Sequence, residues 1–524
     1  MRWDIIGLVI GWTLRIFSAP LVFVGIYSWW WVGEGLDFVL KTYLITFIIA
    51  LILSQSLIRY GYNSQSNNRL IRDREAFAAV ALAWPPIVLI GAIPFWMGGM
   101  FYGPLEFYSG EATFTQLLHG GLHSWFESMS GFTTTGASVI DFNTSPNCTT
   151  EVSDCIASQS KSLILWRSMT QWLGGMGVIM LGLLILSRVL GGGMSLARAE
   201  LTGPTLSRLG PTLQSTARRL WLIYTLLTII EMGALYFVGG MNAFDAVNYS
   251  LTTLPSGGFG TSDAGIMAFN SATIESILIV FMLLTCINFS ILHLIMMGRS
   301  SEALKDEELK SYLLILTVAW LAMAFNIYRS GSEDLGLLES IRHTLFQSIS
   351  ISSTGYSSAN FANWPVFSQF ILLLLMIIGA SAGSTGGGLK VLRIRILFEL
   401  AKREIVRIIQ PRKVVSIRFN EEIIEERTVW MVLGMISSWA VIVTASMLTF
   451  SLFEPSLEMK DVLSVSVSLL GNTGPALGAF GPTETWASLS EPSMFVATLL
   501  MWLGRLELLT VLVLLHPRTW SKSE

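Results

Sequence analysis

The chain has 524 residues, of which 52% are hydrophobic and 13% are charged, and its formal net charge is −3. A soluble domain carries roughly 25% charged residues, whereas apolar runs long enough to cross the ~30 Å hydrocarbon layer of a bilayer recur along this whole chain. The composition excludes a separate soluble domain of ordinary size. It predicts an integral membrane protein whose function lies in or across the bilayer.

Ten apolar runs are predicted to span the membrane as helices, so the expected fold class is an all-α polytopic membrane protein. The first run is too long and too aromatic for a secretory signal and is predicted to be retained as a helix. The predicted spans cover residues 6–31, 38–58, 77–100, 163–189, 220–238, 274–297, 309–328, 367–400, 429–452 and 494–515.

The distribution of charge predicts the orientation. Most of the 33 lysines and arginines lie in the chain ends and in alternate connections between spans, which places both termini on the cytoplasmic side. The opposite face is rich in Asp and Glu, either because an acidic mouth concentrates cations or because outer loops simply lack basic residues. Cys148 and Cys155 share a predicted outer loop, where a disulfide and two free thiols are both compatible with the sequence.

A hydroxyl residue followed by glycine recurs in four similar settings, beginning with "GFTTTGASV" at residues 131–139. Each copy follows a span and a short apolar segment and precedes another span, which predicts four copies of one unit. The four pairs are Thr135 with Gly136, Ser256 with Gly257, Thr354 with Gly355, and Thr473 with Gly474; Thr134 adds a hydroxyl in the first loop.

The short apolar segments before these loops can enter the bilayer halfway but cannot cross it. Each is predicted to be a half-helix that returns through its glycine-containing loop. Irregular backbone at that depth is tolerated only where it is buried in protein or lines a water-filled cavity, so four such loops around one axis would line a pore. The segments cover residues 115–130, 243–254, 337–350 and 458–470.

The chemistry of the loops favours a cation. Glycine permits backbone conformations in which successive carbonyls turn toward an axis, and the neighbouring hydroxyls add oxygen atoms. Rings of carbonyl oxygens replace the hydration shell of K⁺, and the negative ends of the half-helix dipoles would face the same centre. The paired residues and Thr134 are therefore predicted to bind K⁺ as a filter.

Five stretches carry a specific resemblance. They are "SWFESMSGFTTTGASV", "SGGFGTSDAG", "SISISSTGYSS", "LLGNTGPALGAFG" and "GASAGSTGGGLKVLR". These stretches resemble the four pore loops and the intramembrane loop of the Trk/Ktr/HKT superfamily of potassium transporters, most closely its TrkH branch. The resemblance covers nearly the whole chain and implies an N-terminal two-helix unit at 1–72, followed by pore repeats at 73–200, 201–300, 301–425 and 426–524.

The resemblance also implies selectivity. In that family, glycine at the filter position of all four loops goes with potassium transport, while serine in the first loop goes with sodium transport, so Gly136 indicates a potassium carrier. The second loop departs from the family pattern: a hydroxyl residue would be expected near Pro255 and threonine at 256, where this chain has serine. Pro255 also has no N–H with which to hold the loop from behind.

The glycine-rich stretch 379–390 lies inside the predicted span 367–400 and is expected to break that helix. It lacks the Gly-x4-Gly-Lys-Ser/Thr order of a phosphate-binding loop. A mobile flap beneath the filter, acting as a gate, and a passive kink for packing are the two interpretations. The predicted gate residues are Gly383, Ser384, Gly386, Gly387, Gly388 and Lys390.

Arg505 interrupts the last predicted span, where an unpaired charge is costly and indicates function. It is predicted to act as an electrostatic barrier below the filter, as the family's pore arginine does. A structural ion pair is the alternative, with Glu231 on another helix as the suggested partner.

Residues 402–427 form a charged, amphipathic connection that either rests on the membrane, docks a partner or is a solvated loop. The resemblance implies a homodimer in the bacterial inner (cytoplasmic) membrane with a soluble, nucleotide-binding regulatory subunit of the TrkA type on its cytoplasmic face. For the chain itself we expect K⁺ as substrate, no tightly bound cofactor, no nucleotide site and no nucleic-acid partner.

Three functions other than potassium uptake are considered as alternatives for this chain. His119 and His123 have metal-ligand spacing, but no glutamate lies between them and no third ligand is evident, so the chain is not expected to be a metalloenzyme or any other enzyme. The others are the potassium-translocating subunit of an ATP-driven pump and a sodium-selective transporter of the same fold. Transport down the electrochemical gradient and symport with sodium or protons are both compatible with the sequence.

Overall fold

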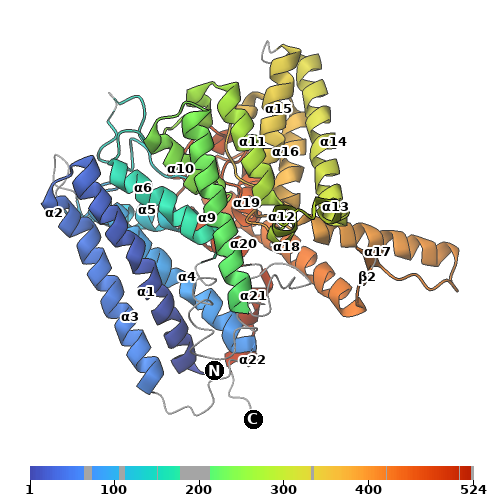
Figure 1. Ribbon diagram of the computed structural model, residues 1–524, viewed down its shortest axis with the longest axis horizontal. Helices are drawn as coiled ribbons and strands as arrows, with labels where there is room; N and C mark the ends of the chain where they lie inside the picture. Colours follow the sequence, from blue (N-terminus) through green and yellow to red (C-terminus); the bar gives the residue numbers. More distant parts are fainter. Residues whose placement is uncertain are drawn as a thin grey trace.

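A computed structural model shows a predominantly helical protein in which the start of α1 and the last described residues lie at the same end of the molecule, which we call the termini end (Figure 1). The structure describes residues 1–63, 73–105, 113–149, 152–177, 213–331, 336–420, 422–506 and 508–520. Trp3 stacks on Trp520 with ring centroids 5.6 Å apart, which joins the first helix to the last segment.

Two N-terminal helices lie along the side of the bundle. Here α1 (Trp3–Tyr27) packs on α3 (Ile45–Asn63), and α1 also packs on α4 (Asp73–Met97). Arg2 and Glu75 form an ion pair of 2.6 Å that fastens the start of α1 to α4. The turn between the two helices contains π-helical segments at Ser28–Val32 and Leu40–Leu44 and the short α2 (Leu36–Val39).

Four groups of three helices make up the rest of the bundle, and the middle helix of each group is short and ends at one of the glycine loops. The groups are α4, α5 (Phe114–Phe132) and α6 (Lys161–Gly175); α9 (Leu213–Phe237), α10 (Ala243–Thr253) and α11 (Ala272–Cys286); α14 (Glu307–Ser330), α15 (Leu337–Ile351) and α16 (Val366–Ile378); and α18 (Glu426–Phe453), α19 (Met459–Gly471) and α20 (Glu491–Arg505).

The groups pack in a closed order. The last helix of each group contacts the short helix of the next: α6 contacts α10, α11 contacts α15, α16 contacts α19, and α20 contacts α5. This cyclic packing brings the ends of the four short helices to one centre.

Local signals set where the short helices begin, and all four lie close to the predicted half-helices. Thr113 and Gln116 form a capping box before α5, and Asn242 accepts a hydrogen bond from the Asp245 N–H at the start of α10. A side chain three residues into the helix likewise accepts from the capping N–H in α15 (Glu339) and in α19 (Asp461). Such caps satisfy N–H groups that have no partner inside the helix.

The number of spans differs from the prediction. Within the described residues, six helices are long and apolar enough to cross a membrane, or seven if the bent pair α11 and α12 (Phe289–Met296) is one span, instead of ten. The predicted span 274–297 is bent by 110° at this pair, and the predicted span 494–515 is divided into α20 and α21 (Leu508–Leu515), followed by α22 (Pro517–Trp520). Residues 178–189 of the predicted span 163–189 lie outside the described residues.

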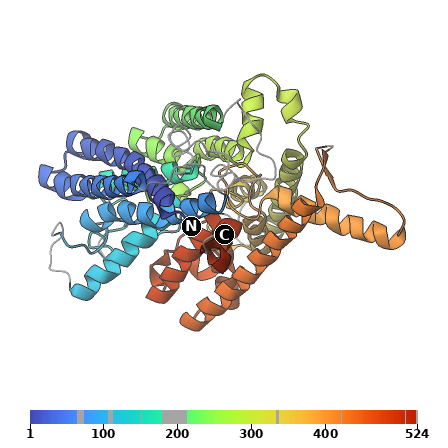
Figure 2. The ribbon, with the colours of Figure 1, turned by 90° about the horizontal axis from the view of Figure 1, so that it is seen from below.

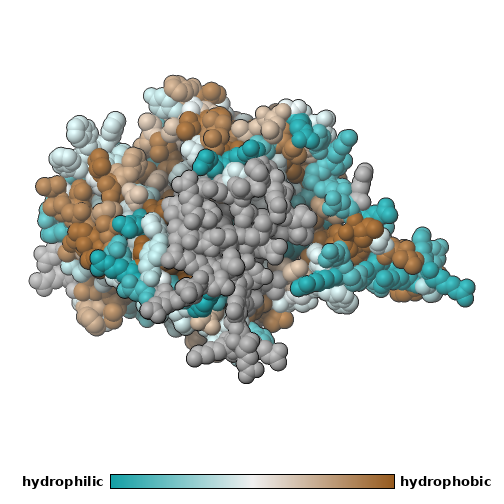
Figure 3. Space-filling model, turned by 60° about the horizontal axis from the view of Figure 1, so that its bottom comes forward, coloured by the Kyte–Doolittle hydropathy of each residue, from teal (hydrophilic) through white to brown (hydrophobic). Residues whose placement is uncertain are grey.

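The predicted span 367–400 is interrupted. It breaks at residues 379–390, as expected, but α17 (Val391–Ile409) then leaves the bundle as a projecting arm (Figures 1 and 2). The chain then returns to the base of the arm, where β1 (Arg418–Phe419) and β2 (Glu422–Ile423) form an antiparallel hairpin, so the fold is not purely helical. The surface of the arm carries hydrophilic and hydrophobic side chains, and hydrophobic side chains also gather on the flanks of the bundle (Figure 3).

Candidate functional site

The four short helices end in loops that each contain a glycine in the left-handed region of backbone conformation. The φ angles are +85° at Gly136, +82° at Gly258, +85° at Gly355 and +100° at Gly474. Residues with a side chain rarely adopt such angles, so each loop requires glycine at this position.

These glycines close a ring. A Cβ atom on any one of them would come closer than 3.0 Å to a carbonyl oxygen of a neighbouring loop. The contacts run from Gly136 to the Gly257 oxygen, from Gly258 to Thr354, from Gly355 to Thr473, and from Gly474 back to Thr135. Four carbonyl oxygens and four glycines therefore alternate around one centre, with no room for a side chain at any of the four joints.

In the second loop the left-handed glycine lies one residue later than in the predicted pair. The sequence paired Ser256 with Gly257, but the left-handed glycine that packs on the next loop is Gly258, and Gly257 supplies the carbonyl oxygen. Ser256 (φ +62°) instead occupies the position of Thr134 (φ +53°) in the first loop. The other three predicted pairs all lie in the ring.

The loop hydroxyls mainly hold the loops in place. The Thr135 hydroxyl lies 2.8 Å from the Thr133 hydroxyl and accepts a hydrogen bond of 2.9 Å from the side-chain amide of Asn472, which joins the fourth loop to the first. Thr354 is similarly bonded to Ser353. Their role as additional ion ligands, expected from the sequence, stays a prediction.

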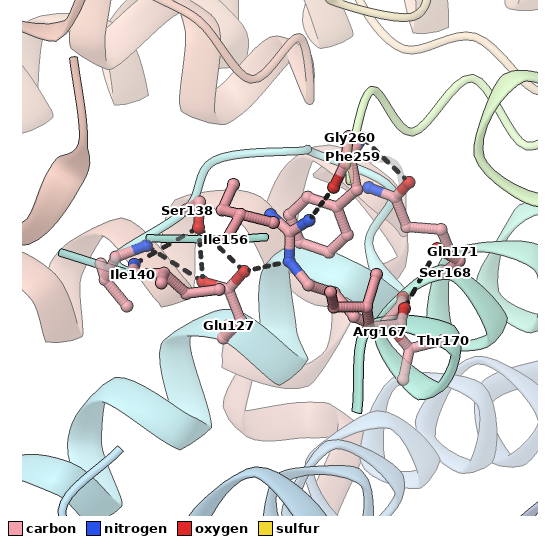
Figure 4. A network of polar contacts seen from close by, with 12 residues as sticks. Glu127, Ser138, Ile140, Ile156, Arg167, Ser168, Thr170, Gln171, Phe259 and Gly260 are labelled. Carbon is pink, nitrogen blue, oxygen red and sulfur yellow. Dashed lines mark hydrogen bonds and ion pairs between the residues drawn. The ribbon is translucent and has the colours of Figure 1, made fainter. Parts of the chain in front are cut away.

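A buried ion pair supports the first two loops from outside the ring (Figure 4). Arg167 of α6 and Glu127 of α5 are 2% and 0% exposed, and their nitrogen and oxygen atoms lie 2.6 Å apart. Glu127 also accepts hydrogen bonds from Ser138 and from the Val139 N–H, just beyond the first loop. Neither Arg167 nor Glu127 was among the predicted site residues, although a basic residue inside an apolar helix was an available signal.

The guanidinium of Arg167 also reaches the second loop. It donates to the Gly260 carbonyl at 2.9 Å and stacks 3.4 Å from the centre of the Phe259 ring. Gln171, one turn further along α6, donates to the Gly257 carbonyl at 2.7 Å and accepts from the Phe259 N–H at 3.2 Å. Two side chains of α6 thus hold the second loop, in which Pro255 can donate no hydrogen bond.

A disulfide-bonded loop lies over this region. Cys148 and Cys155 are joined, with Cα atoms 5.0 Å apart, which decides between the two possibilities left by the sequence. Both oxygens of Asp263 accept N–H groups of this loop, from Cys155 at 2.6 Å and from Ile156 at 2.9 Å. Burial raises the pKa of Asp263, and these two hydrogen bonds oppose the rise.

The segment 379–390, which we call the flap, packs against the inner ends of the loops. Its Thr385 hydroxyl lies 2.8 Å from the Ser256 hydroxyl, and its Gly388 N–H donates to the Gly471 carbonyl at 3.0 Å. A Cβ atom on Gly387 would overlap that same carbonyl oxygen. The predicted gate residues are therefore gathered beneath the loops, and the Lys390 ammonium donates back to the Gly386 carbonyl within the flap.

The flap also explains the bend between α11 and α12. The Ser381 N–H donates to the Cys286 carbonyl at 3.1 Å, and the Phe289 N–H donates to the Gly383 carbonyl at 3.1 Å. The flap thus supplies partners for backbone groups that the broken helix leaves unpaired, which permits a break inside an apolar bundle. This break was not predicted because the run 274–297 is mostly apolar and contains neither glycine nor proline.

Arg505 ends α20 beneath the ring. One guanidinium nitrogen donates to the Thr385 carbonyl of the flap at 2.9 Å, and another donates to the carbonyls of Gly174 and Gly175 at 2.9 and 2.7 Å. The suggested pairing with Glu231 is not formed: both carboxylate oxygens of Glu231 are buried without a hydrogen-bond partner among the described residues. Arg505 instead joins the flap to α6.

The two histidines considered as metal ligands lie away from the loops. His119 pairs with Glu491 at 2.7 Å. In the part of the chain that the structure describes, no three His, Cys, Asp or Glu side chains are grouped to hold a metal ion.

Known proteins similar in sequence to this chain are cation and potassium transport proteins. The TrkH family model, described as a cation transport protein, matches residues 47–522. The Trk system potassium uptake protein TrkH of Escherichia coli K12 is 32% identical over 531 residues and 100% of both chains. Its counterpart in Halomonas elongata is 32% identical over 91% of this chain and 92% of its own, and the TrkG protein of E. coli K12 is 28% identical over 92% of each chain.

A solved structure shares the fold. The crystal structure of the potassium transporter TrkH from Vibrio parahaemolyticus aligns with a TM-score of 0.81 and 28% sequence identity, over 99% of this chain and 100% of that one.

Proposed function

The chain belongs to the TrkH family of cation transport proteins, and on that basis we propose that it takes up potassium across the membrane through the ring of its four glycine loops. Four groups of helices, taken as pore repeats, surround the ring, and the N-terminal helix pair lies outside them. The chain is a transporter rather than an enzyme.

The observation that carries the proposal is the closed ring of carbonyl oxygens from Thr135, Gly257, Thr354 and Thr473, each packed on a glycine of the adjacent loop. Backbone carbonyls arranged in rings are the ligands that replace the water around K⁺. The C-terminal ends of the four short helices meet at the same place, and their dipoles favour a cation there.

Rubidium uptake into liposomes that contain the purified chain tests the function. With an imposed membrane potential, uptake should follow the potential, and unlabelled potassium should compete far better than sodium. Equal competition by sodium would favour a sodium-selective transporter. Absence of flux, even with a TrkA-type ring added, would favour a pump subunit that requires a catalytic partner.

Gly136→Ser is expected to move selectivity toward sodium. The serine side chain would overlap the Gly257 carbonyl and would hold a residue with a Cβ atom at φ +85°. Strain of this kind costs about 1–3 kcal/mol. If this strain displaces the Gly257 carbonyl oxygen from the ring, the preference for potassium over sodium should fall by roughly tenfold. The ratio of potassium to sodium competition measures this preference.

Gly33→Ser is the matched control, because Gly33 also has φ +77° but nothing lies within 4 Å of its Cβ position. The control should keep the parent's selectivity. If Gly136→Ser keeps it too, the assignment of Gly136 to the filter is wrong.

We propose that the flap is the gate and that Arg505 holds it closed while adding a positive barrier below the ring. Arg505→Ala should therefore give faster rubidium uptake with poorer closure. A hydrogen bond to a charged group contributes about 1.5–3 kcal/mol, so uptake should increase by at least about tenfold. Arg505→Lys keeps the charge but not the forked geometry, so its uptake rate should lie between those of the parent and Arg505→Ala. Unchanged uptake by a folded Arg505→Ala protein would favour a structural role.

The assembly is also part of the proposal: a homodimer in the bacterial inner membrane, with cytoplasmic termini and a TrkA-type regulatory subunit on the termini end. The projecting arm supports an interface there, because its side chains Phe398, Ile408 and Val414 are 71%, 80% and 97% exposed. Light scattering of the detergent-solubilised protein, alone and with the regulatory ring, measures both associations.

A further inference from the structure

Glu308 joins the flap to the projecting arm. We propose that Glu308 is a positioning residue whose carboxylate holds the flap closed and links the flap to the hairpin at the base of the arm. The inference rests on the proposed gate function of the flap and names the residue through which the gate would be controlled.

One carboxylate oxygen of Glu308 holds both ends of the flap. Glu308 is the second residue of α14 and is 4% exposed. Its Oε1 atom accepts the Ala382 N–H at 2.7 Å, near the start of the flap, and the Leu392 N–H at 3.1 Å, just beyond its end. The two bonds fix the base of the loop that Gly383 to Lys390 form.

The same carboxylate caps the arm. Leu392 lies in the first turn of α17, and the residue at the N-cap position, Lys390, provides no side-chain cap. A carboxylate from another helix takes that role, and a negative charge is favoured at a helix N-terminus. Removing Glu308 therefore releases the flap and the first turn of α17 together.

The residues just before Glu308, at the start of α14, bind the hairpin. The Glu307 N–H donates to the Asn420 side chain at 2.9 Å, and the Asn420 amide donates to Asp306 at 2.8 Å. Glu307 also pairs with Arg395 of α17 at 2.7 Å. One turn of helix therefore contacts the hairpin, α17 and the flap, so a displacement of the hairpin reaches the flap through a few hydrogen bonds.

The test is rubidium uptake by the purified full chain in liposomes, with maximal uptake and the potassium concentration for half-competition measured separately. Glu308→Ala should raise maximal uptake by at least about tenfold, because two bonds to a charged acceptor are lost. The half-competition value should not change, because the filter is untouched. Maximal uptake by Glu308→Gln should lie between the values for the parent and Glu308→Ala, because the amide oxygen of glutamine still accepts a hydrogen bond.

Glu302→Gln is the matched control. It removes a carboxylate of the neighbouring α13 (Ser300–Ala303), which pairs with exposed Arg299 and does not contact the flap, and uptake should match the parent. Asn420→Ala breaks the link from the hairpin without leaving a buried charge, and should raise maximal uptake by a smaller factor.

Two outcomes separate this inference from the gate itself. If Arg505→Ala accelerates uptake but folded Glu308 variants and Asn420→Ala do not, the role of Glu308 is wrong and the gate stands. If none of these variants accelerates uptake, the gate proposal fails as well. Should Glu308→Ala not fold, Glu308→Gln and Asn420→Ala decide, and parental uptake in both overturns the inference.

Discussion

Arg167→Met is expected to destabilise the protein by about 3–5 kcal/mol, the usual effect of removing one partner from a buried ion pair. Glu127 would remain with 0% exposure and no opposite charge, and the second loop would lose the hydrogen bond to the Gly260 carbonyl. The stacking of the guanidinium on Phe259 would be lost as well. This is the largest effect on stability that we expect from a single side chain.

Thermal unfolding of the detergent-solubilised protein, followed by tryptophan fluorescence, measures the loss. Arg342→Met is the comparison, because Arg342 pairs with Glu275 in similar geometry; Glu275 is only 4% exposed, but Arg342 is 29% exposed, so water can reach this pair and the loss should be smaller. The double variant Arg167→Met with Glu127→Gln should recover part of the loss, since no unpaired charge remains. Equal losses for Arg167→Met and Arg342→Met would contradict the importance of burial here.

Gly258→Ala is expected to abolish potassium-selective uptake, whereas Gly257→Ala should keep a substantial part of it. At Gly258 the added methyl group would meet the Thr354 carbonyl and the backbone would be strained at φ +82°. At Gly257 the methyl group would meet the end of the Gln171 side chain and disturb its two hydrogen bonds to the loop, but it would meet no backbone carbonyl and φ is not positive. The expected difference follows from a rigid neighbour in one case and a flexible one in the other.

Competition by potassium and sodium for rubidium uptake ranks the two variants. Size-exclusion profiles establish that both fold. The register predicted from sequence, with Gly257 as the filter glycine, requires the opposite ranking, so a more damaging Gly257→Ala would restore that register and refute the ring described here.

The second loop shows where sequence reasoning reached its limit. The position of the short helix before it could be predicted, because a cap at Asn242 and an apolar stretch are local signals. The choice between Gly257 and Gly258 could not, because both glycines fit the local pattern. The Thr354 carbonyl that selects Gly258 belongs to a different loop, far along the chain.

The supporting side chains escaped prediction for a related reason. Glu127, Gln171 and Glu308 act on backbone groups of other segments, so no spacing within their own helices indicates their partners. Arg505 was recognised because a charge in an apolar helix is conspicuous, yet the expected ionic partner was wrong: backbone carbonyls take that place. A hydropathy profile likewise identifies apolar runs only. It could not show that α16 is too short to cross the membrane or that α17 leaves the bundle.

Four different segments of one polypeptide close the ring, so each joint is encoded once. In a pore made of four identical subunits, one codon change alters all four ligands together, and intermediate forms are hard to reach. Here a change at Gly136, Gly258, Gly355 or Gly474 touches a single joint and leaves three intact. Ion preference in such a chain can therefore change through single substitutions during evolution, and protein engineering can alter one of the four loops at a time.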